Sequence, residues 1–169
     1  KSTRKCVQQG AQSQKLGKNY CEQERVADPQ RCYTHANSML AKDLTDYAVF
    51  DSGDLELCFG SSEMALKDIE NRTATILQDG KLPFMIGGEH LVTLGAFRAV
   101  LKKYPDLQIV HFDAHADLRD DYLGARLSHA CVLRRCHELV GDGHIHQFCI
   151  RSGDRTEFEF AAQHTEMHK

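Results

Sequence analysis

The stretch that decides the fold is LQIVHFDAHADL, residues 107–118. Its first half, 107–112, is rich in the apolar and β-branched residues that a buried strand prefers. Its second half carries Asp113, His115 and Asp117 at alternate positions, which places all three side chains on one side of an extended chain. Two carboxylates and an imidazole on one side suit a divalent ion that prefers oxygen and nitrogen ligands, such as manganese. Such residues also commonly cap a loop, but three in alternation favour a metal site.

The overall composition is that of an ordinary globular protein. With 169 residues, 41% of them hydrophobic, the chain is long enough for about one domain with a sizeable core. A net charge of −3 gives no reason to expect a nucleic-acid or acidic-membrane partner. The polar start lacks the apolar segment of a secretory signal, and no apolar run approaches the length of a membrane span.

Cysteine usage points to a reducing compartment. The seven cysteines are odd in number, and no pair has the C-x-x-C spacing of a zinc ribbon or a redox motif. We therefore expect mostly reduced thiols and a cytoplasmic protein. The N-terminal segment, residues 1–40, is polar and without a sustained period, so we expect a poorly ordered or divergent arm. A basic tail for an acidic partner is the alternative, although its charge density is low.

The rest of the chain, 41–169, alternates between strand and helix patterns. Strands are predicted at 47–51, 81–86, 107–112 and 145–150, and helices at 62–78, 91–104, 129–139 and 156–163. This alternation predicts an α/β fold with a parallel sheet and right-handed crossovers. Functional sites in such sheets lie outside the carboxyl ends of the strands. No element is predicted for the last residues, 164–169.

Three further histidines have competing interpretations. His90 follows the predicted strand 81–86, and adjacent parallel strands would bring it near Asp113, which favours a metal ligand over a capping or core histidine. His111 is either a satisfied core histidine, the favoured view, or a partner that orients a ligand. His129 begins a predicted helix, where it serves as a proton shuttle or as a helix cap. The remaining four are expected at the surface: His144, His146, His164 and His168.

Four motifs together resemble the ureohydrolase family, the arginase and agmatinase group, and are most similar to the agmatinase branch. They are GGEH at 87–90, HFDAHADLRDDYLG at 111–124, SHA at 128–130 and IRSGDR at 150–155. The resemblance covers residues 43–169. It implies a three-layer α/β/α fold with a parallel sheet and a dinuclear manganese centre, two Mn²⁺ ions, at the carboxyl edge.

The resemblance also implies roles for individual residues. His90, Asp113 and Asp117 would hold one metal, His115 would hold the second, and Asp113 would bridge the two. His129 resembles the proton-shuttling histidine of the family. The implied reaction is manganese-dependent hydrolysis of a guanidino compound, first of all agmatine to putrescine and urea, with arginine and guanidinobutyrate as alternatives. A homo-oligomer is expected for a complete chain, with a small-molecule substrate and neither nucleic acid nor membrane as a partner.

One departure from the family limits this expectation. The family's second metal motif, an Asp-x-Asp, lies further along the chain, and here no aspartate follows Asp154. We therefore expect an incomplete C-terminal half of the fold, with four of the family's six ligands. The alternative is a catalytically incompetent fragment that binds at most one metal or acts as an interaction module. Amide deacetylation on the same fold is a third possibility, against which the GGEH and SHA motifs argue.

Overall fold

The structure is a computed structural model and describes residues 50–168. They belong to two compact units, one containing 57–82 and 89–168 and the other containing 50–56 and 83–88. Every helix and strand assigned among the described residues lies in the first unit. The predicted N-terminal arm, 1–40, lies outside the described residues.

Helix α3, Ser62–Gln78, begins and ends at the signals that its sequence carries. The Ser61 hydroxyl accepts a hydrogen bond from the backbone N–H of Met64 at 3.3 Å, as an N-cap residue does. After the helix, Gly80 has φ of 69° and the N–H of Lys81 donates to the carbonyl of Ile76, which closes the last turn. The spacing of apolar residues predicts a buried face that starts at Met64 or Ala65 and continues through Leu66, Ile69, Thr73 and Ile76 or Leu77. Leu66, Ile69, Thr73 and Leu77 are buried, whereas Met64 is 58% exposed.

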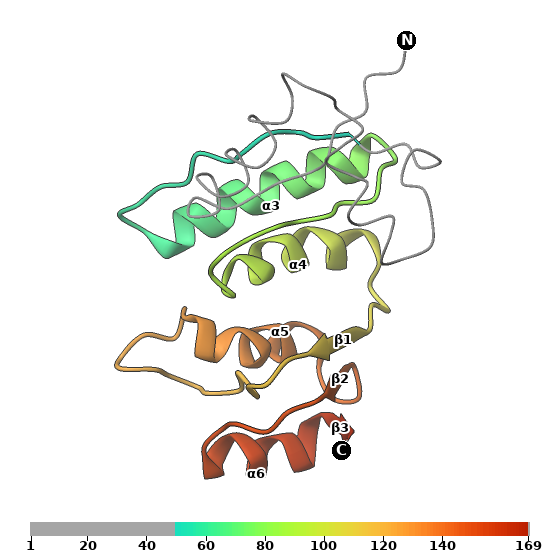
Figure 1. The fold of residues 1–169 in the computed structure, drawn as a ribbon. Coiled ribbons are helices and arrows are strands. Elements are labelled where there is room, and N and C mark those ends of the chain that lie inside the picture. The colour runs from blue at the N-terminus through green and yellow to red at the C-terminus, as the bar shows by residue number, and fades with distance from the viewer. Residues whose placement is uncertain (1–49, 169) are drawn as a thin grey trace, which may run out of the picture. The chain divides into compact units, whose positions relative to one another are not determined.

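Helix α4, Val92–Lys103, packs directly against α3 (Figure 1). Gly95 permits this approach, because a Cβ atom there would lie 2.7 Å from the Leu66 carbonyl oxygen. The sequence predicts a buried stripe on this helix made of Leu91, Leu94, Phe97, Val100 or Leu101, and Tyr104. Leu94 and Phe97 are buried. Tyr104 was expected in the same stripe but is 49% exposed, because the helix ends at Lys103 and the Tyr104 backbone leaves helical geometry with φ of −129°.

The sheet has the predicted parallel pairing. Its strands are β1 (Ile109–Phe112), β2 (Ile145–Phe148) and β3 (Glu166–His168), in the order β1-β2-β3. Both pairs are parallel. β2 ends two residues earlier than predicted, because Cys149 has φ of 67° and cannot continue an extended strand. β3 was not predicted, since three residues are too few to display a period.

Two further helices return the chain between the strands. α5, Val132–Val140, follows a 3₁₀ turn, η2, His129–Cys131, so the predicted helix 129–139 starts with a tighter turn than expected. α6, Arg155–His164, starts at a capping box in which Asp154 accepts from the Glu157 backbone and Glu157 accepts from the Asp154 backbone.

The hydrophobic core lies against one face of the sheet. Ile145 is fully buried there, together with Leu118 and residues of α3, α4 and α5. Cys136 belongs to this core, and burial raises the pKa of its thiol to about 12. Residues of opposite parity on β1 point away from the core: Val110 is 59% exposed and Phe112 is 71% exposed.

The predicted strand 81–86 is wrong. None of its residues is in a strand, and Leu82 and Phe84 are 89% and 63% exposed. A strand is stable only when its backbone pairs with a neighbour, and no other described segment pairs with this one. Of the predicted strand 47–51, only Phe50 and Asp51 are described, and neither is in a strand. The turn predicted after it is present, since the Asp51 carboxylate accepts from the Gly53 N–H at 2.8 Å.

Two further predictions from the sequence concern the cysteines and membrane-spanning segments. The four cysteines within residues 50–168 are free: Cys58, Cys131, Cys136 and Cys149. No helix in the described part of the chain is long and apolar enough to cross a membrane.

Candidate metal centre and active site

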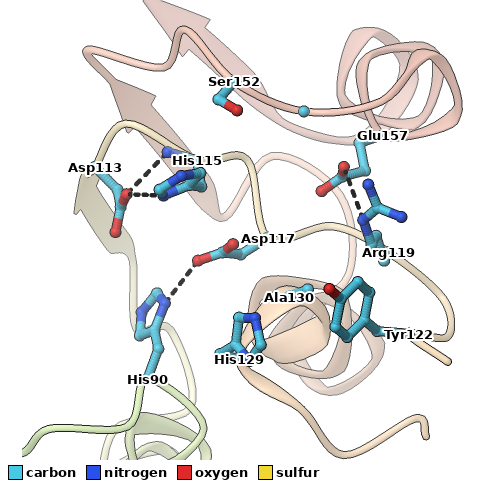
Figure 2. Close-up of a pocket in the computed structure, with 11 residues that line it drawn as sticks. His90, Asp113, His115, Asp117, Arg119, Tyr122, His129, Ala130, Ser152 and Glu157 are labelled. Carbon is cyan, nitrogen blue, oxygen red and sulfur yellow. Dashed lines mark hydrogen bonds and ion pairs between the residues drawn. The ribbon is translucent and has the colours of Figure 1, made fainter.

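A pocket of about 450 Å³ opens where β1 and β2 end. Its walls come from the start of α4, the loop after β1, the turn η2 and the loop between β2 and α6 (Figure 2). The pocket contains all five residues singled out from the sequence as metal ligands or proton shuttle: His90, Asp113, His115, Asp117 and His129. A site at the carboxyl ends of parallel strands is the location that the fold class predicts.

His90 and Asp117 form the tightest contact of the pocket. Nδ1 of His90 lies 2.7 Å from Oδ2 of Asp117. This hydrogen bond raises the pKa of His90, against the opposing effect of burial. Asp117 is 8% exposed and has φ of 52°, a left-handed conformation that is costly for a residue with a side chain. The backbone is therefore strained at the residue that contacts His90.

Asp113 is held as a charged group by its neighbours. Burial tends to raise the pKa of Asp113, but the backbone N–H of His115 and the imidazoles of His111 and His90 outweigh it, so the pKa is lowered. The His115 N–H donates to Oδ1 of Asp113 at 2.8 Å, and Nδ1 of the His115 ring lies 3.3 Å from the same oxygen (Figure 2). Asp113 therefore presents an ionised carboxylate between two histidines.

The donor atoms of this cluster suit a divalent ion. His90, His111, Asp113 and Asp117 each offer one ligand atom, and these atoms lie within 4.8 Å of one another. The structure thus brings together three of the four ligands predicted from the sequence. The fourth, His115, is 65% exposed and stands beside Asp113 alone. Imidazole nitrogens with two carboxylates form the kind of mixed set that manganese accepts.

His111 lies near the ligands, but its hydrogen bonds give it a different role. The amide nitrogen of Gln147 donates to the carbonyl of Ala116 at 2.9 Å, and a carbonyl can only accept, so the orientation of this amide is fixed. The same nitrogen lies 3.1 Å from Nδ1 of His111, which must then be the acceptor. The proton of a neutral His111 ring is therefore on Nε2.

That nitrogen, Nε2 of His111, is buried and has no hydrogen-bond partner in the described part of the chain. It faces Asp113, with Oδ2 at 3.6 Å. Burial lowers the pKa of His111, which favours the neutral ring. An N–H aimed at a carboxylate orients that carboxylate rather than binding the ion itself. The geometry favours the orienting role over the satisfied core histidine that the sequence suggested first.

Backbone hydrogen bonds hold the loop after β1 in place. The N–H groups of Arg151 and Ser152 both donate to the Ala114 carbonyl, at 2.9 and 2.8 Å, and the Ala116 N–H donates to the Ser152 carbonyl at 3.0 Å. The Leu118 N–H donates to the buried carboxylate of Glu157 at 3.0 Å. The two loops that carry the motifs at 111–124 and 150–155 are thereby joined into one wall of the pocket.

Six residues that line the pocket were not singled out from the sequence as site residues: Arg119, Tyr122, Ala130, Ser152, Gly153 and Glu157. The Arg119 guanidinium lies 3.1 Å from Asp154 and 3.4 Å from Glu157, and sits over the Tyr122 ring at 5.4 Å. A signal for Arg119 was present, because it continues the alternation of Asp113, His115 and Asp117. For Glu157 the signal was its place three residues after Asp154, the spacing of a capping box.

His129 reaches the pocket from the turn η2. Its side chain is 60% exposed, and its Nδ1 lies 4.0 Å from a carboxylate oxygen of Glu89. The edge of its ring meets the Tyr122 ring at 5.4 Å. An exposed imidazole at the pocket mouth is placed to exchange protons with solvent.

Comparisons with known proteins bear on the family of this chain. The model of the arginase family matches residues 13–169. The agmatinase of Bacillus subtilis (strain 168) is 48% identical over 124 residues, which are 73% of this chain and 43% of that protein. The guanidinobutyrase of Pseudomonas aeruginosa is 34% identical over 114 residues, 66% of this chain and 36% of that one.

A solved structure gives the same result for the fold. The crystal structure of a candidate agmatinase from Clostridium difficile superimposes with a TM-score of 0.82 at 41% identity, over 98% of this chain and 62% of that one. The fold is therefore the arginase-like α/β fold with a parallel sheet. The chain spans 43% of the length of the agmatinase relative. On the family match and these similarities, the chain belongs to the arginase family.

Proposed function

We propose that this chain supplies part of a manganese-dependent active site that hydrolyses a guanidino compound, with agmatine as the preferred substrate. The observation that carries the proposal is the convergence of His90, Asp113 and Asp117 in one pocket that also contains His115 and His129. Similarity to proteins named agmatinase and guanidinobutyrase supports the substrate class. The products would be urea and an amine, putrescine in the case of agmatine.

In this proposal His90, Asp113 and Asp117 hold one ion, and Asp113 with His115 begins the site for a second. Asp113 contacts the His115 ring (Figure 2) and also has a ligand atom within 4.8 Å of one from His90, which supports the sharing of Asp113. Bound manganese supplies Lewis-acid chemistry that makes water nucleophilic near neutral pH. The carboxylates also attract a cationic guanidinium group into the pocket.

His129 would deliver a proton to the amine that leaves when the C–N bond breaks. An imidazole titrates near neutral pH, so it can take a proton from solvent and give it to the leaving nitrogen. Its exposure at the pocket mouth and its position beside Glu89 support this role. The reaction needs such a donor, because an amine leaves more readily once it is protonated.

The surroundings of Arg119 bear on the tail of the substrate. Two carboxylates, Asp154 and Glu157, contact the Arg119 guanidinium and neutralise its charge. A neutralised arginine repels a cationic tail less, and attracts a carboxylate tail less, than a free one. This arrangement supports agmatine, whose tail ends in an amine, over guanidinobutyrate, whose tail ends in a carboxylate.

Manganese binding and urea release test the proposal together. The chain should bind Mn²⁺, detected by the loss of the free-ion signal in electron paramagnetic resonance. Asp113→Asn should weaken binding by more than about 100-fold, beyond the 10–100-fold cost of losing a residue that only supports a ligand. Asp106→Asn, an exposed aspartate outside the pocket, is the matched control and should change nothing. Equal affinity in the two variants would overturn the assignment of Asp113.

A second candidate is a chain that binds metal without turning over substrate. The observation that favours it is the span of 43% of the agmatinase relative. Urea release from agmatine, measured for this chain and for a version extended with the downstream sequence, decides between the two. Activity of the 169-residue chain would exclude the second candidate. Activity of neither version, with Mn²⁺ bound, would contradict the proposed substrate.

A further inference from the structure

A second cluster of potential ligands lies away from the pocket, at His137, Asp142 and His164. Nε2 of His137 and Nδ1 of His164 each lie 2.8 Å from the same carboxylate oxygen, Oδ1 of Asp142. The three residues come from the last turn of α5, the turn before β2 and the end of α6. Nothing in the proposed hydrolytic chemistry uses them.

The position of this cluster separates it from the pocket. Asp142 lies three residues before the first residue of β2 and His164 lies two residues before the first residue of β3, so the cluster lies at the amino ends of these parallel strands. The pocket residues Asp113 and Ser152 follow the carboxyl ends of β1 and β2. The two sites are therefore at opposite edges of the sheet.

We propose that His137, Asp142 and His164 bind a divalent transition-metal ion of the zinc type. One ligand atom from each residue lies within 4.8 Å of the other two. Two imidazoles and a carboxylate provide three protein ligands of the kind that zinc accepts, with a fourth position left for water. Imidazole-rich sets favour such ions over magnesium or calcium, which prefer oxygen throughout.

The geometry of the three residues is close to what an ion requires. Tetrahedral zinc with bonds of about 2.0–2.1 Å separates its ligand atoms by roughly 3.3 Å. Each of the two nitrogens lies 2.8 Å from Oδ1 of Asp142, so these two nitrogen–oxygen distances must each lengthen by about 0.5 Å. Asp142 is 67% exposed and stands between Gly141 and Gly143, which leaves its side chain free to move outward. Each imidazole shifts its proton to the other ring nitrogen when the ion takes its place.

Packing already orients the two imidazoles. The Phe160 ring meets His137 edge-on at 4.9 Å and lies against His164 at 4.3 Å. The Arg134 guanidinium covers the Phe160 ring at 3.6 Å. The ligands are thus preorganised, and a bound ion would connect the end of α5 to the end of α6.

A third group, His146, Glu166 and His168, serves as an internal comparison. Its glutamate oxygen lies 3.0 Å from one histidine and 4.0 Å from the other. This looser group is expected to bind zinc more weakly than His137, Asp142 and His164. Variants in it therefore distinguish a built site from general binding by surface histidines.

The test is zinc binding to the 169-residue chain, measured by competition with a chromophoric chelator. His137→Gln and His164→Gln should each lose one zinc equivalent, with affinity reduced by more than about 10-fold. His144→Gln, outside all three groups, and His146→Gln, within the third, are the matched controls and should retain it. The pocket is unchanged in all four variants, so any zinc bound there is common to them.

A second measurement protects the test against misfolding of a variant. In the unsubstituted chain, the first equivalent of zinc should shift the ring resonances of His137 and His164 before those of His146 and His168. Unshifted His137 and His164 resonances, or equal zinc affinity in all four variants, would overturn the proposal. Loss of zinc only in His146→Gln would likewise overturn it, because the ion would then belong to the third group.

Discussion

The two histidine–aspartate clusters use the same ligand types in opposite settings. In the pocket, Asp117 is 8% exposed, has a strained backbone and lies 2.7 Å from His90. At the other edge of the sheet, Asp142 is 67% exposed on a glycine-flanked turn. The two clusters contain the same types of potential ligand. They differ in the contacts around those residues, which make one cluster rigid and partly buried and leave the other adaptable at the surface.

The largest effect is expected from Asp117→Asn. Asparagine tolerates φ of 52° almost as well as aspartate, so the backbone is preserved while the charge is removed. Manganese affinity should fall by more than about 100-fold, whereas zinc binding at His137, Asp142 and His164 should stay unchanged. Competition with a chelator measures both. A parallel loss of the two affinities would mean that the clusters are coupled and would break the comparison.

A smaller effect is expected from Gln147→Leu, which removes the amide that keeps the proton of the His111 ring on Nε2. Manganese should bind about 10-fold more weakly, because Asp113 loses an oriented partner. The unsatisfied Ala116 carbonyl should also lower the free energy of unfolding by about 1–3 kcal/mol. Ring ¹⁵N shifts of His111 report the tautomer directly, and unchanged shifts would contradict the role given to Gln147.

The control for that variant is Gln108→Leu. Gln108 is exposed and its amide contacts His144 and His146, so the same substitution is made without touching His111. It should leave manganese affinity and the His111 tautomer as they are. Equal losses in the two variants would show that the effect comes from general destabilisation.

Phe160→Leu should weaken the surface cluster only modestly. Aromatic pairs contribute about 0.5–1.5 kcal/mol beyond their buried area, so zinc affinity should fall between about 2-fold and 10-fold. Phe158→Leu changes the same helix on the side that meets Gly153, near the pocket, and should leave zinc affinity unchanged. If Phe160→Leu has no effect, its packing does not preorganise the two imidazoles.

The smallest effect is the pH dependence of the metal-free chain. The hydrogen bond to Asp117 raises the pKa of His90 above its ordinary value of 6.5. A raised pKa means that this pair stabilises the fold fully below the unfolded-state value, and that the contribution is lost as pH rises through the folded-state value. An NMR titration of the His90 ring should give a midpoint above 6.5 that falls in Asp117→Asn. A midpoint at or below 6.5 would contradict the pairing.

Local signals in the sequence predicted most of the described fold. Ser61 and Gly80 mark the ends of α3, and the apolar stretch before Asp113 contains β1. The prediction of a strand at 81–86 was wrong. The alternation of apolar residues there is a local signal, but a strand forms only when it pairs with another segment of the chain. β3 was missed because pairing with β2, rather than its own composition, makes it a strand.

The candidate site was also predictable in part, because some of its residues lie close together in the sequence. Asp113, His115 and Asp117 lie within one five-residue segment, so their short spacing brought them to the same pocket, although they belong to the loop after β1 and Asp117 has φ of 52°. Gln147 was not predictable, because its contacts with His111 and Ala116 depend on the pairing of β1 with β2. The cluster of His137 and His164 depends on where two helices end, and the sequence analysis assigned His164 simply to the surface.

The left-handed backbone at Asp117 has a consequence for how this sequence can change over evolutionary time. The position makes two demands: a negative charge opposite His90 and tolerance of φ of 52°. Aspartate and glutamate meet the first demand, while glycine, asparagine and aspartate meet the second. Aspartate alone meets both. Under the metal-binding role that we propose for Asp117, a chain with any other residue at position 117 would lose either the carboxylate ligand or the shape of the loop.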